Sequence, residues 1–327
     1  MSVPRVSGDA AAAAPRTASW AALLAAALLA GCGVTPTKPA GLPERVELAA
    51  VPFHPQREYE CGPASLAMLL NAAGVDVSTD ALVPQVYLPA RRGTLQVELV
   101  AATRRHGRLP YVPAPTPAAL YAELAAGRPA IVLQNFGSRA SPQWHYAVAI
   151  GFEPGYVLLR SGTTERLRLR ESRFLGTWER GDAWALVALR PGELPAGDDP
   201  RRYLEAAAAF ERDAAPVDAA AAFEAATQRW PAEALAWLGL GNARVRLGDD
   251  AGAEAAFRAA LEHAPASVAA RNNLAELLAR RGCHAAARVE IERAARDAEG
   301  APLAAAVAAT RAGMARHADA GDSCAAP

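Results

Sequence analysis

Hydrophobic positions divide the chain into three stretches with different patterns. A short apolar run extends from Trp20 to Ala30, which is well below the roughly 20 residues that a membrane-spanning helix needs. From about residue 49 to 192, apolar runs bounded by Gly and Pro alternate with helical stretches. From about residue 200 onward the pattern becomes Ala-rich and helical. These patterns predict a short leader, a mixed α and β domain, and an all-α domain.

The mixed stretch begins with helices and ends with strands. A helix is predicted from Gly62 to about Gly74, since the proline after Gly62 suits a first helical turn. A second helix is predicted from its cap at Thr116 to Gly127. Helices followed by a run of strands are typical of an α+β fold. The predicted strands are Ala130–Gln134, Tyr146–Ile150, Tyr156–Arg160, Arg166–Leu169 and Trp184–Leu189.

The Ala-rich stretch contains an internal repeat of 34 residues. The positions that recur are Ala219, Phe223, Ala226 and Pro231, which return as Ala253, Phe257, Ala260 and Pro265. This spacing resembles the tetratricopeptide repeat, in which small residues lie where two helices cross; the alternative is two generic Ala-rich hairpins. The all-α domain would span 200–317, with repeats at 200–233, 234–267 and 268–301, a capping helix after them and a tail at 318–327.

Composition narrows the possible functions. The 327 residues suggest two domains, and 34 basic residues balance 34 acidic ones, so we expect no nucleic-acid partner. The six histidines are scattered, and no Cys-x-x-Cys, His-Glu-x-x-His or phosphate-loop motif occurs, so no metal or cofactor is expected. Four cysteines are too few for a disulfide-built scaffold of this length.

The N-terminal segment is typical of an export signal. Arg5 and Arg16 precede the apolar run, as in a signal peptide. The residues from Leu28 to Cys32 resemble the bacterial lipoprotein box, which implies acylation of Cys32, removal of residues 1–31 and a membrane attachment; an ordinary signal peptide is the alternative. Gly33, in place of an aspartate, favours the outer membrane with the body in the periplasm. Residues 32–48 form a proline-containing tether.

Candidate chemistry is concentrated at one cysteine and one histidine. Cys61 opens the first apolar helix, where free N–H groups and the helix dipole stabilise a thiolate. Gln56, five residues upstream, can bring a side-chain N–H to the same oxyanion as the Cys61 backbone N–H. His145 begins an apolar strand, whose rigid end can aim an imidazole at the thiol.

These residues resemble the papain-like cysteine peptidases of the bacteriocin-processing, double-glycine leader peptidase-like family. Its marks are a glutamine shortly before Cys-Gly-Pro-x-x-Leu, here 61–66, and a later histidine before an apolar strand. The resemblance implies a papain-like α+β domain over 49–192. It also implies that Cys61 is the nucleophile, His145 the general base and acid, and Gln56 the oxyanion donor, in metal-free hydrolysis of a peptide or protein substrate through a thioester.

The chain departs from this family at one position. Relatives place an Asp or Asn on the next strand to hold the imidazole, whereas this chain has Ser161. A serine hydroxyl can accept a hydrogen bond from the imidazole but brings no charge. Either Ser161 orients His145 weakly, or another residue such as Asp182 reaches in, or turnover is low.

Two further cysteines and one aromatic residue leave alternatives open. If Cys32 is acylated and Cys61 is a free thiol, Cys283 and Cys324 remain as a pair, which an oxidising periplasm favours as a disulfide; two unpaired thiols are the alternative. Trp144 either packs beside the site or lines a substrate groove.

Three functions are therefore compatible with the sequence. The first is a lipid-anchored periplasmic cysteine peptidase whose repeats dock a protein partner or substrate. The second is an acyl or amide transferase that uses the same Cys–His pair. The third is a non-catalytic assembly lipoprotein that keeps a degenerate peptidase scaffold.

Overall fold

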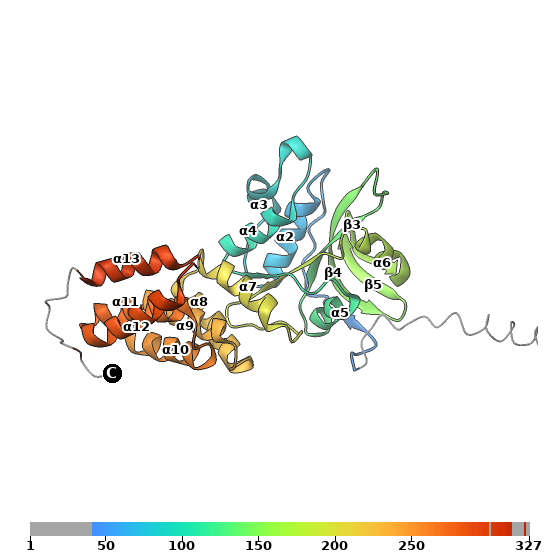
Figure 1. Cartoon of the computed structure of the whole chain (residues 1–327). Helices are drawn as coiled ribbons and strands as arrows, with labels where there is room; N and C mark the ends of the chain where they lie inside the picture. The colour runs from blue at the N-terminus through green and yellow to red at the C-terminus, as the bar shows by residue number, and fades with distance from the viewer. Residues whose placement is uncertain (1–40, 301, 316–323, 325–327) are drawn as a thin grey trace, which may run out of the picture. The chain divides into compact units, whose positions relative to one another are not determined.

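The computed structural model describes residues 41–300, 302–315 and 324 (Figure 1). The predicted signal peptide, Cys32 and most of the predicted tether lie outside these residues. No helix among the described residues is long and apolar enough to cross a membrane.

A seven-stranded antiparallel sheet forms the centre of the first domain. The strand order is β2-β7-β3-β4-β5-β6, and β1 pairs with β4 outside this path. The five predicted strands correspond to β3–β7, whereas the short β1 and β2 were not predicted. The strands are β1 Val46–Glu47, β2 Leu109–Tyr111, β3 Ala130–Asn135, β4 Trp144–Glu153, β5 Tyr156–Ser161, β6 Thr164–Arg170 and β7 Ala185–Leu189.

Helices cover both faces of this sheet (Figure 1). Tyr146 and Val148 of β4 pack in a cluster with α2, while Ala147 and Ala149 between them belong to a second cluster with α5 and α6. A strand sends successive side chains to opposite faces, so β4 packs against helices on both sides. The antiparallel sheet with its packed helices confirms the predicted α+β class. The helices are α2 Cys61–Ala72, α3 Thr79–Val86, the 3₁₀ turn η1 Pro89–Arg91, α4 Gln96–Arg105, α5 Pro117–Ala125 and α6 Glu171–Glu179.

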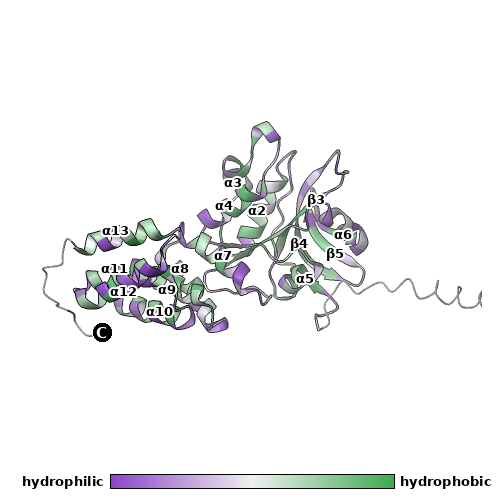
Figure 2. Cartoon of the chain, in the orientation of Figure 1, coloured by the Kyte–Doolittle hydropathy of each residue, from purple (hydrophilic) through white to green (hydrophobic). Residues whose placement is uncertain are grey.

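Helix α2 is enclosed by protein along most of its length. Every residue from Gly62 to Leu70 is buried, so the helix has no polar face to turn toward water. Its mostly apolar colouring is visible in Figure 2. A helix that is apolar all round belongs in a core. The residue that opens α2 is therefore carried on a rigid element.

The Ala-rich stretch folds into helix pairs, with a further helix after them. The pairs fall within the three predicted repeat ranges, and α13 falls within the predicted capping region. Gly239 and Gly241 show why the repeat needs small residues, because a Cβ there would come within 2.2 Å of Phe223 and 2.4 Å of Phe257. The helices are α7 Pro200–Glu211, α8 Pro216–Arg229, α9 Ala234–Leu247, α10 Asp250–His263, α11 Val268–Arg280, α12 His284–Asp297 and α13 Ala304–Ala315.

The first helix of the Ala-rich stretch shares a core with the sheet. Tyr203 and Phe210 of α7 belong to the same buried cluster as Leu109 and Tyr111 of β2. The predicted boundary between 192 and 200 therefore separates two sequence patterns that share one continuous core.

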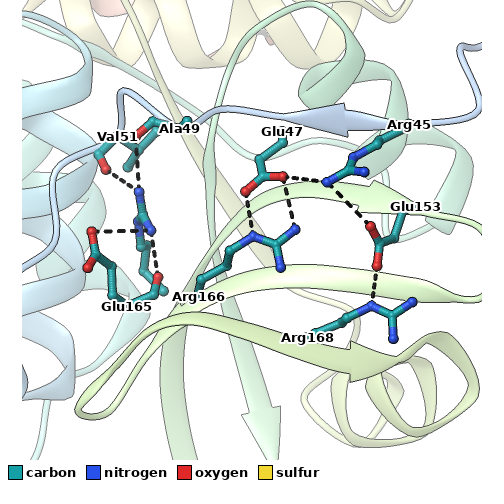
Figure 3. Close-up of polar contacts among 9 residues, drawn as sticks. Arg45, Glu47, Ala49, Val51, Glu153, Glu165, Arg166 and Arg168 are labelled. Atoms are coloured by element: carbon teal, nitrogen blue, oxygen red, sulfur yellow. Dashed lines mark hydrogen bonds and ion pairs between the residues drawn. The ribbon is translucent and has the colours of Figure 1, made fainter.

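Ion pairs fasten the N-terminal segment of the domain across the sheet (Figure 3). Glu47 of β1 accepts hydrogen bonds from Arg166 at 2.6 and 3.0 Å and from Arg45 at 3.1 Å. The buried Arg160 of β5 donates to the carbonyl oxygens of Ala49 and Val51 at 3.1 and 2.8 Å. These contacts fix the path of the chain that leads to Gln56.

Candidate active site

Cys61 is the first residue of α2 and is partly buried. The preceding residue, Glu60, provides no side-chain cap, so the N–H groups of the first turn remain available. The thiol is hydrogen-bonded by the backbone of Tyr146, Gly62 and Cys61 itself. Burial raises the pKa of the Cys61 thiol, and these backbone hydrogen bonds oppose that rise. The site therefore offers N–H donors to a thiolate but keeps the isolated thiol protonated.

The glycine after Cys61 is required by a close approach. A Cβ at Gly62 would lie 2.4 Å from the hydroxyl oxygen of Thr94. Thr94 is held nearby because its carbonyl oxygen accepts a hydrogen bond from the Tyr146 hydroxyl at 3.2 Å. The Cys-Gly pair thus allows the loop before α4 to pack against the start of α2.

His145 is the second residue of β4 and is half-buried. Its Nε2 lies 2.9 Å from the hydroxyl oxygen of Ser161 on β5. When Nε2–H donates to that oxygen, Nδ1 carries the lone pair that can act as a base. The Phe136 ring also lies against the imidazole, at 5.7 Å between centroids. Burial lowers the pKa of His145, which favours the neutral imidazole.

Of the two residues suggested to orient His145, the structure brings Ser161 to the imidazole. Ser161 contacts the imidazole, whereas Asp182 is an exposed turn residue after α6 whose backbone N–H donates to Glu179. Asp182 adopts a left-handed backbone conformation, with φ of 59°. Among the described residues, no hydrogen bond joins the Cys61 thiol directly to the His145 ring.

Gln56 is fixed between three parts of the domain. Its Nε2 donates to the Tyr146 carbonyl oxygen at 3.1 Å and to the Ser65 hydroxyl at 3.3 Å. Its Oε1 accepts from the Gly162 N–H at 3.0 Å, and its own N–H donates to the Gly162 carbonyl oxygen. The Gln56 side-chain amide thus contacts Tyr146 of β4, the residue whose backbone also contacts the Cys61 thiol. Both of its N–H groups are engaged, so a bound oxyanion would have to replace the longer contact to Ser65.

Three exposed aromatic residues stand on the segments that carry the site. Tyr59, Phe136 and Trp144 are 45%, 43% and 53% exposed. Trp144 is therefore not packed into the core. Phe136 was missed by the sequence analysis, because only the pairing of β3 with β4 brings it to His145.

His54, which precedes Gln56 by two residues, has a structural partner. His54 is hydrogen-bonded through Nε2 to Asn71 Oδ1 at 2.7 Å, at the far end of α2.

Within the described part of the chain, no group of three or more His, Cys, Asp or Glu is arranged to hold a metal ion. The structure joins Cys283, which precedes α12, to Cys324 by a disulfide, with the Cα atoms 4.3 Å apart. Cys61 is the free cysteine of the described residues.

Two family models match the chain. Residues 48–180 match the model described as the Peptidase_C39 like family. Residues 216–265 and 242–305 match the model of the tetratricopeptide repeat. The first match begins one residue before the predicted domain start, and the second begins at α8, after the first helix of the predicted repeat array.

Several solved structures are similar to parts of the chain, at low identity. A C39-like peptidase from Bacillus anthracis is 18% identical, with 45% of this chain and 98% of that chain covered and a TM-score of 0.38. The peptidase domain of Streptococcus ComA is 22% identical, with 43% and 99% covered and a TM-score of 0.35. The TPR2B domain of yeast Sti1 is 16% identical, with 36% and 94% covered and a TM-score of 0.33. No curated protein sequence matches the chain.

Proposed function

We propose that this chain, which joins a Peptidase_C39-like domain to tetratricopeptide repeats, is a cysteine peptidase that hydrolyses a peptide bond through a Cys61 thioester. The observation that carries the proposal is the convergence on Tyr146. Its backbone contacts the Cys61 thiol, and its carbonyl oxygen accepts a hydrogen bond from Gln56. The residue just before it is His145, whose ring is held by Ser161. Nucleophile, oxyanion donor and base thus meet at one strand end.

The proposed reaction assigns a separate step to each group. The Cys61 thiol gives its proton to Nδ1 of His145, and the sulfur attacks the carbonyl carbon of the substrate. The resulting oxyanion accepts hydrogen bonds from the Cys61 backbone N–H and from Gln56 Nε2. The C–N bond then breaks as the imidazolium protonates the leaving amine. A water molecule, deprotonated by His145, finally hydrolyses the thioester.

Burial opposes the transfer of the thiol proton from Cys61 to His145. It raises the pKa of the Cys61 thiol and lowers that of His145, so both shifts favour the neutral pair in the free protein. Ion-pair formation therefore depends on groups that stabilise the thiolate and the imidazolium. The backbone N–H groups at the start of α2 serve the thiolate, and Ser161 serves the imidazolium without a charge.

The repeats provide the proposed docking surface. Side chains of α9, α10 and α11 line a cavity of about 260 Å³, with Phe257 at its apolar part and Arg246 and Arg280 at its polar part. Asn273 donates to Asn242 Oδ1 at 2.8 Å in the same cavity. Amide side chains can exchange such a bond for bonds to a peptide backbone, so an extended peptide or one helix fits this surface.

The proposed location is the periplasmic side of the outer membrane. The lipoprotein-like sequence before Cys32 and the glycine at position 33 support it. Mass spectrometry of the N-terminal peptide from membranes tests it: a diacylated or triacylated Cys32 is expected, and an unmodified cysteine or a different mature N-terminus would contradict it.

A non-catalytic scaffold is the second candidate. It is favoured by the neutral Ser161 and by the lack of a direct Cys61–His145 hydrogen bond among the described residues. Labelling with a peptide-like thiol electrophile separates the candidates. A peptidase predicts that Cys61 reacts much faster than a free thiol and that His145→Ala slows it. Equal rates support the scaffold, and fast labelling with acylation of an added amine but no cleavage supports a transferase.

A further inference from the structure

Gln134 of β3 is a buried polar residue with one unused atom. Its side chain is fully buried, and its Nε2 donates to the Thr177 hydroxyl at 2.6 Å. Its Oε1 is buried and has no hydrogen-bond partner. Most buried polar atoms in proteins are hydrogen-bonded, and leaving one unpaired costs about 1–3 kcal/mol. An unpaired acceptor in the core therefore calls for an explanation.

The hydrogen-bond network fixes which end of the amide is unpaired. The Thr177 hydroxyl donates back into its own helix α6, to the carbonyl oxygens of Phe174 at 2.9 Å and Arg173 at 3.2 Å. Its single proton is thus used, and toward Gln134 it can only accept. The atom bonded to it must be the NH₂ group, which leaves Oε1 as the unpaired acceptor.

Strand pairing places Gln134 beside the candidate base. In the β3–β4 register Gln134 is directly opposite His145. Directly paired residues of antiparallel strands send their side chains to the same face, with Cβ atoms about 4.5–5.5 Å apart. Phe136, two residues further along β3, already touches the imidazole. Ser161 contacts the same ring from β5, so His145 lies between polar groups of both neighbouring strands.

We propose that Gln134 is a positioning residue for His145, whose amide, anchored by Thr177, presents its Oε1 to the imidazolium formed during catalysis. This inference rests on the proposed Cys61–His145 chemistry. A partial negative charge in a buried site favours the charged form of an adjacent imidazole. Gln134 would thereby supply part of the stabilisation that a carboxylate gives in relatives and that Ser161 lacks.

The test is the titration of His145 followed by NMR in the purified protein, with its signals assigned by their loss in His145→Gln. Relative to the unmodified protein, Gln134→Leu should lower the pKa of His145, so that the imidazole binds its proton about threefold more weakly. Gln134→Glu should make the imidazole bind its proton about tenfold more tightly. Both variants leave the other ionisable groups of the surrounding elements unchanged. These are Cys61, Tyr146 and Glu153, Tyr156 and Arg160 on β5, Glu171, Arg173 and Glu179 on α6, Arg180 after α6, and Arg57 and Glu60 before α2.

The melting temperature separates a positioning role of Gln134 from a merely structural one, because a structural role would lower the melting temperature of the variants. Gln134→Leu removes the unpaired acceptor together with the hydrogen bond to Thr177, two effects of opposite sign, so its melting temperature should stay close to that of the unmodified protein. Thr177→Val, which frees the amide but keeps Oε1, should shift His145 less than Gln134→Leu. An unchanged His145 titration in both Gln134 variants would overturn the proposal. Repeating the titration in Cys61→Ala separates it from catalysis, since His145 titrates there whether or not the protein is a peptidase.

Discussion

At the scale of single residues, the candidate site combines a partly buried thiol, a half-buried imidazole and a neutral partner. Ser161 holds His145 at 2.9 Å, but burial still lowers the pKa of the imidazole. Local spacing was enough to predict Cys61, Gln56 and His145, since each lies within a short segment of recognisable pattern. Gln134 could not be predicted, because its proximity to His145 depends on the register of two strands.

Restoring a carboxylate at position 161 tests this electrostatic account. Ser161→Asp should increase the rate of Cys61 alkylation about tenfold, because a charge-assisted hydrogen bond stabilises the imidazolium more than a neutral one does. Ser161→Ala should decrease the rate. Ser172→Asp, on the exposed start of α6, controls for the added charge. Equal alkylation rates in the two position-161 variants would show that Ser161 does not support the imidazolium.

The close packing at Gly62 gives a second prediction. Gly62→Ala should destabilise the domain by about 1–3 kcal/mol in urea unfolding, since the new methyl group would overlap Thr94. Adding Thr94→Gly should recover a large part of the loss, because it removes the side chain that the methyl group meets. If Gly62→Ala is as stable as the unmodified protein, the close approach is not a constraint on the Cys-Gly sequence.

At the scale of elements, the strands were easier to predict than the small helices. Continuous apolar runs indicated β3, β4 and β7, whose residues are almost all buried. Helix α3 contains Pro84 and β2 contains Pro110, which oppose the structure that each adopts. Their packing, not their local preference, determines them: Leu82 in α3 and the whole of β2 are buried.

The two-residue strand β1 depends on its ion pairs. The hydrogen bond from Arg166, together with Arg45, lowers the pKa of Glu47 from 4.5 to about 2. A carboxylate with a lowered folded-state pKa contributes stability above its unfolded value, and loses it as the pH falls from 4.5 through about 2. Glu47→Gln should therefore cost up to about 1 kcal/mol at pH 7, a value limited by solvent screening, and almost nothing near pH 2.

Urea unfolding at several pH values measures this difference. Glu44→Gln, at an exposed carboxylate three residues away, is the matched control for the loss of one surface charge. A Glu47→Gln difference that is the same at pH 7 and pH 2 would mean that packing, not charge, explains the contribution of Glu47.

At the scale of the whole molecule, a sheet domain and a helical repeat domain share one core through α7. The 34-residue period predicted the helix pairs, because each pair needs the same small and large residues at its crossing. Neither the substrate nor the partner can be read from the pattern, since both depend on the shape of surfaces that the repeat leaves variable.

The cysteines allow a whole-molecule test by thiol counting. Cys283 and Cys324 are joined in the structure, so denatured but unreduced protein should show Cys61 as the reactive thiol of these three. Reduction should release two more. Alkylation of Cys283 and Cys324 before reduction would contradict the disulfide.

Cleavage by Cys61 in the native envelope is the central claim, and a comparison of protein N-termini tests it most directly. Membrane and periplasmic fractions from cells with the unmodified protein are compared with fractions from cells carrying Cys61→Ala at equal abundance. The account predicts one or more internal N-termini, each from a cleaved substrate, that are lost in Cys61→Ala and in His145→Ala. The uncleaved substrate should accumulate in both variants. Identical N-termini in all strains, under conditions in which the protein is expressed and folded, would contradict the claim that it is a peptidase.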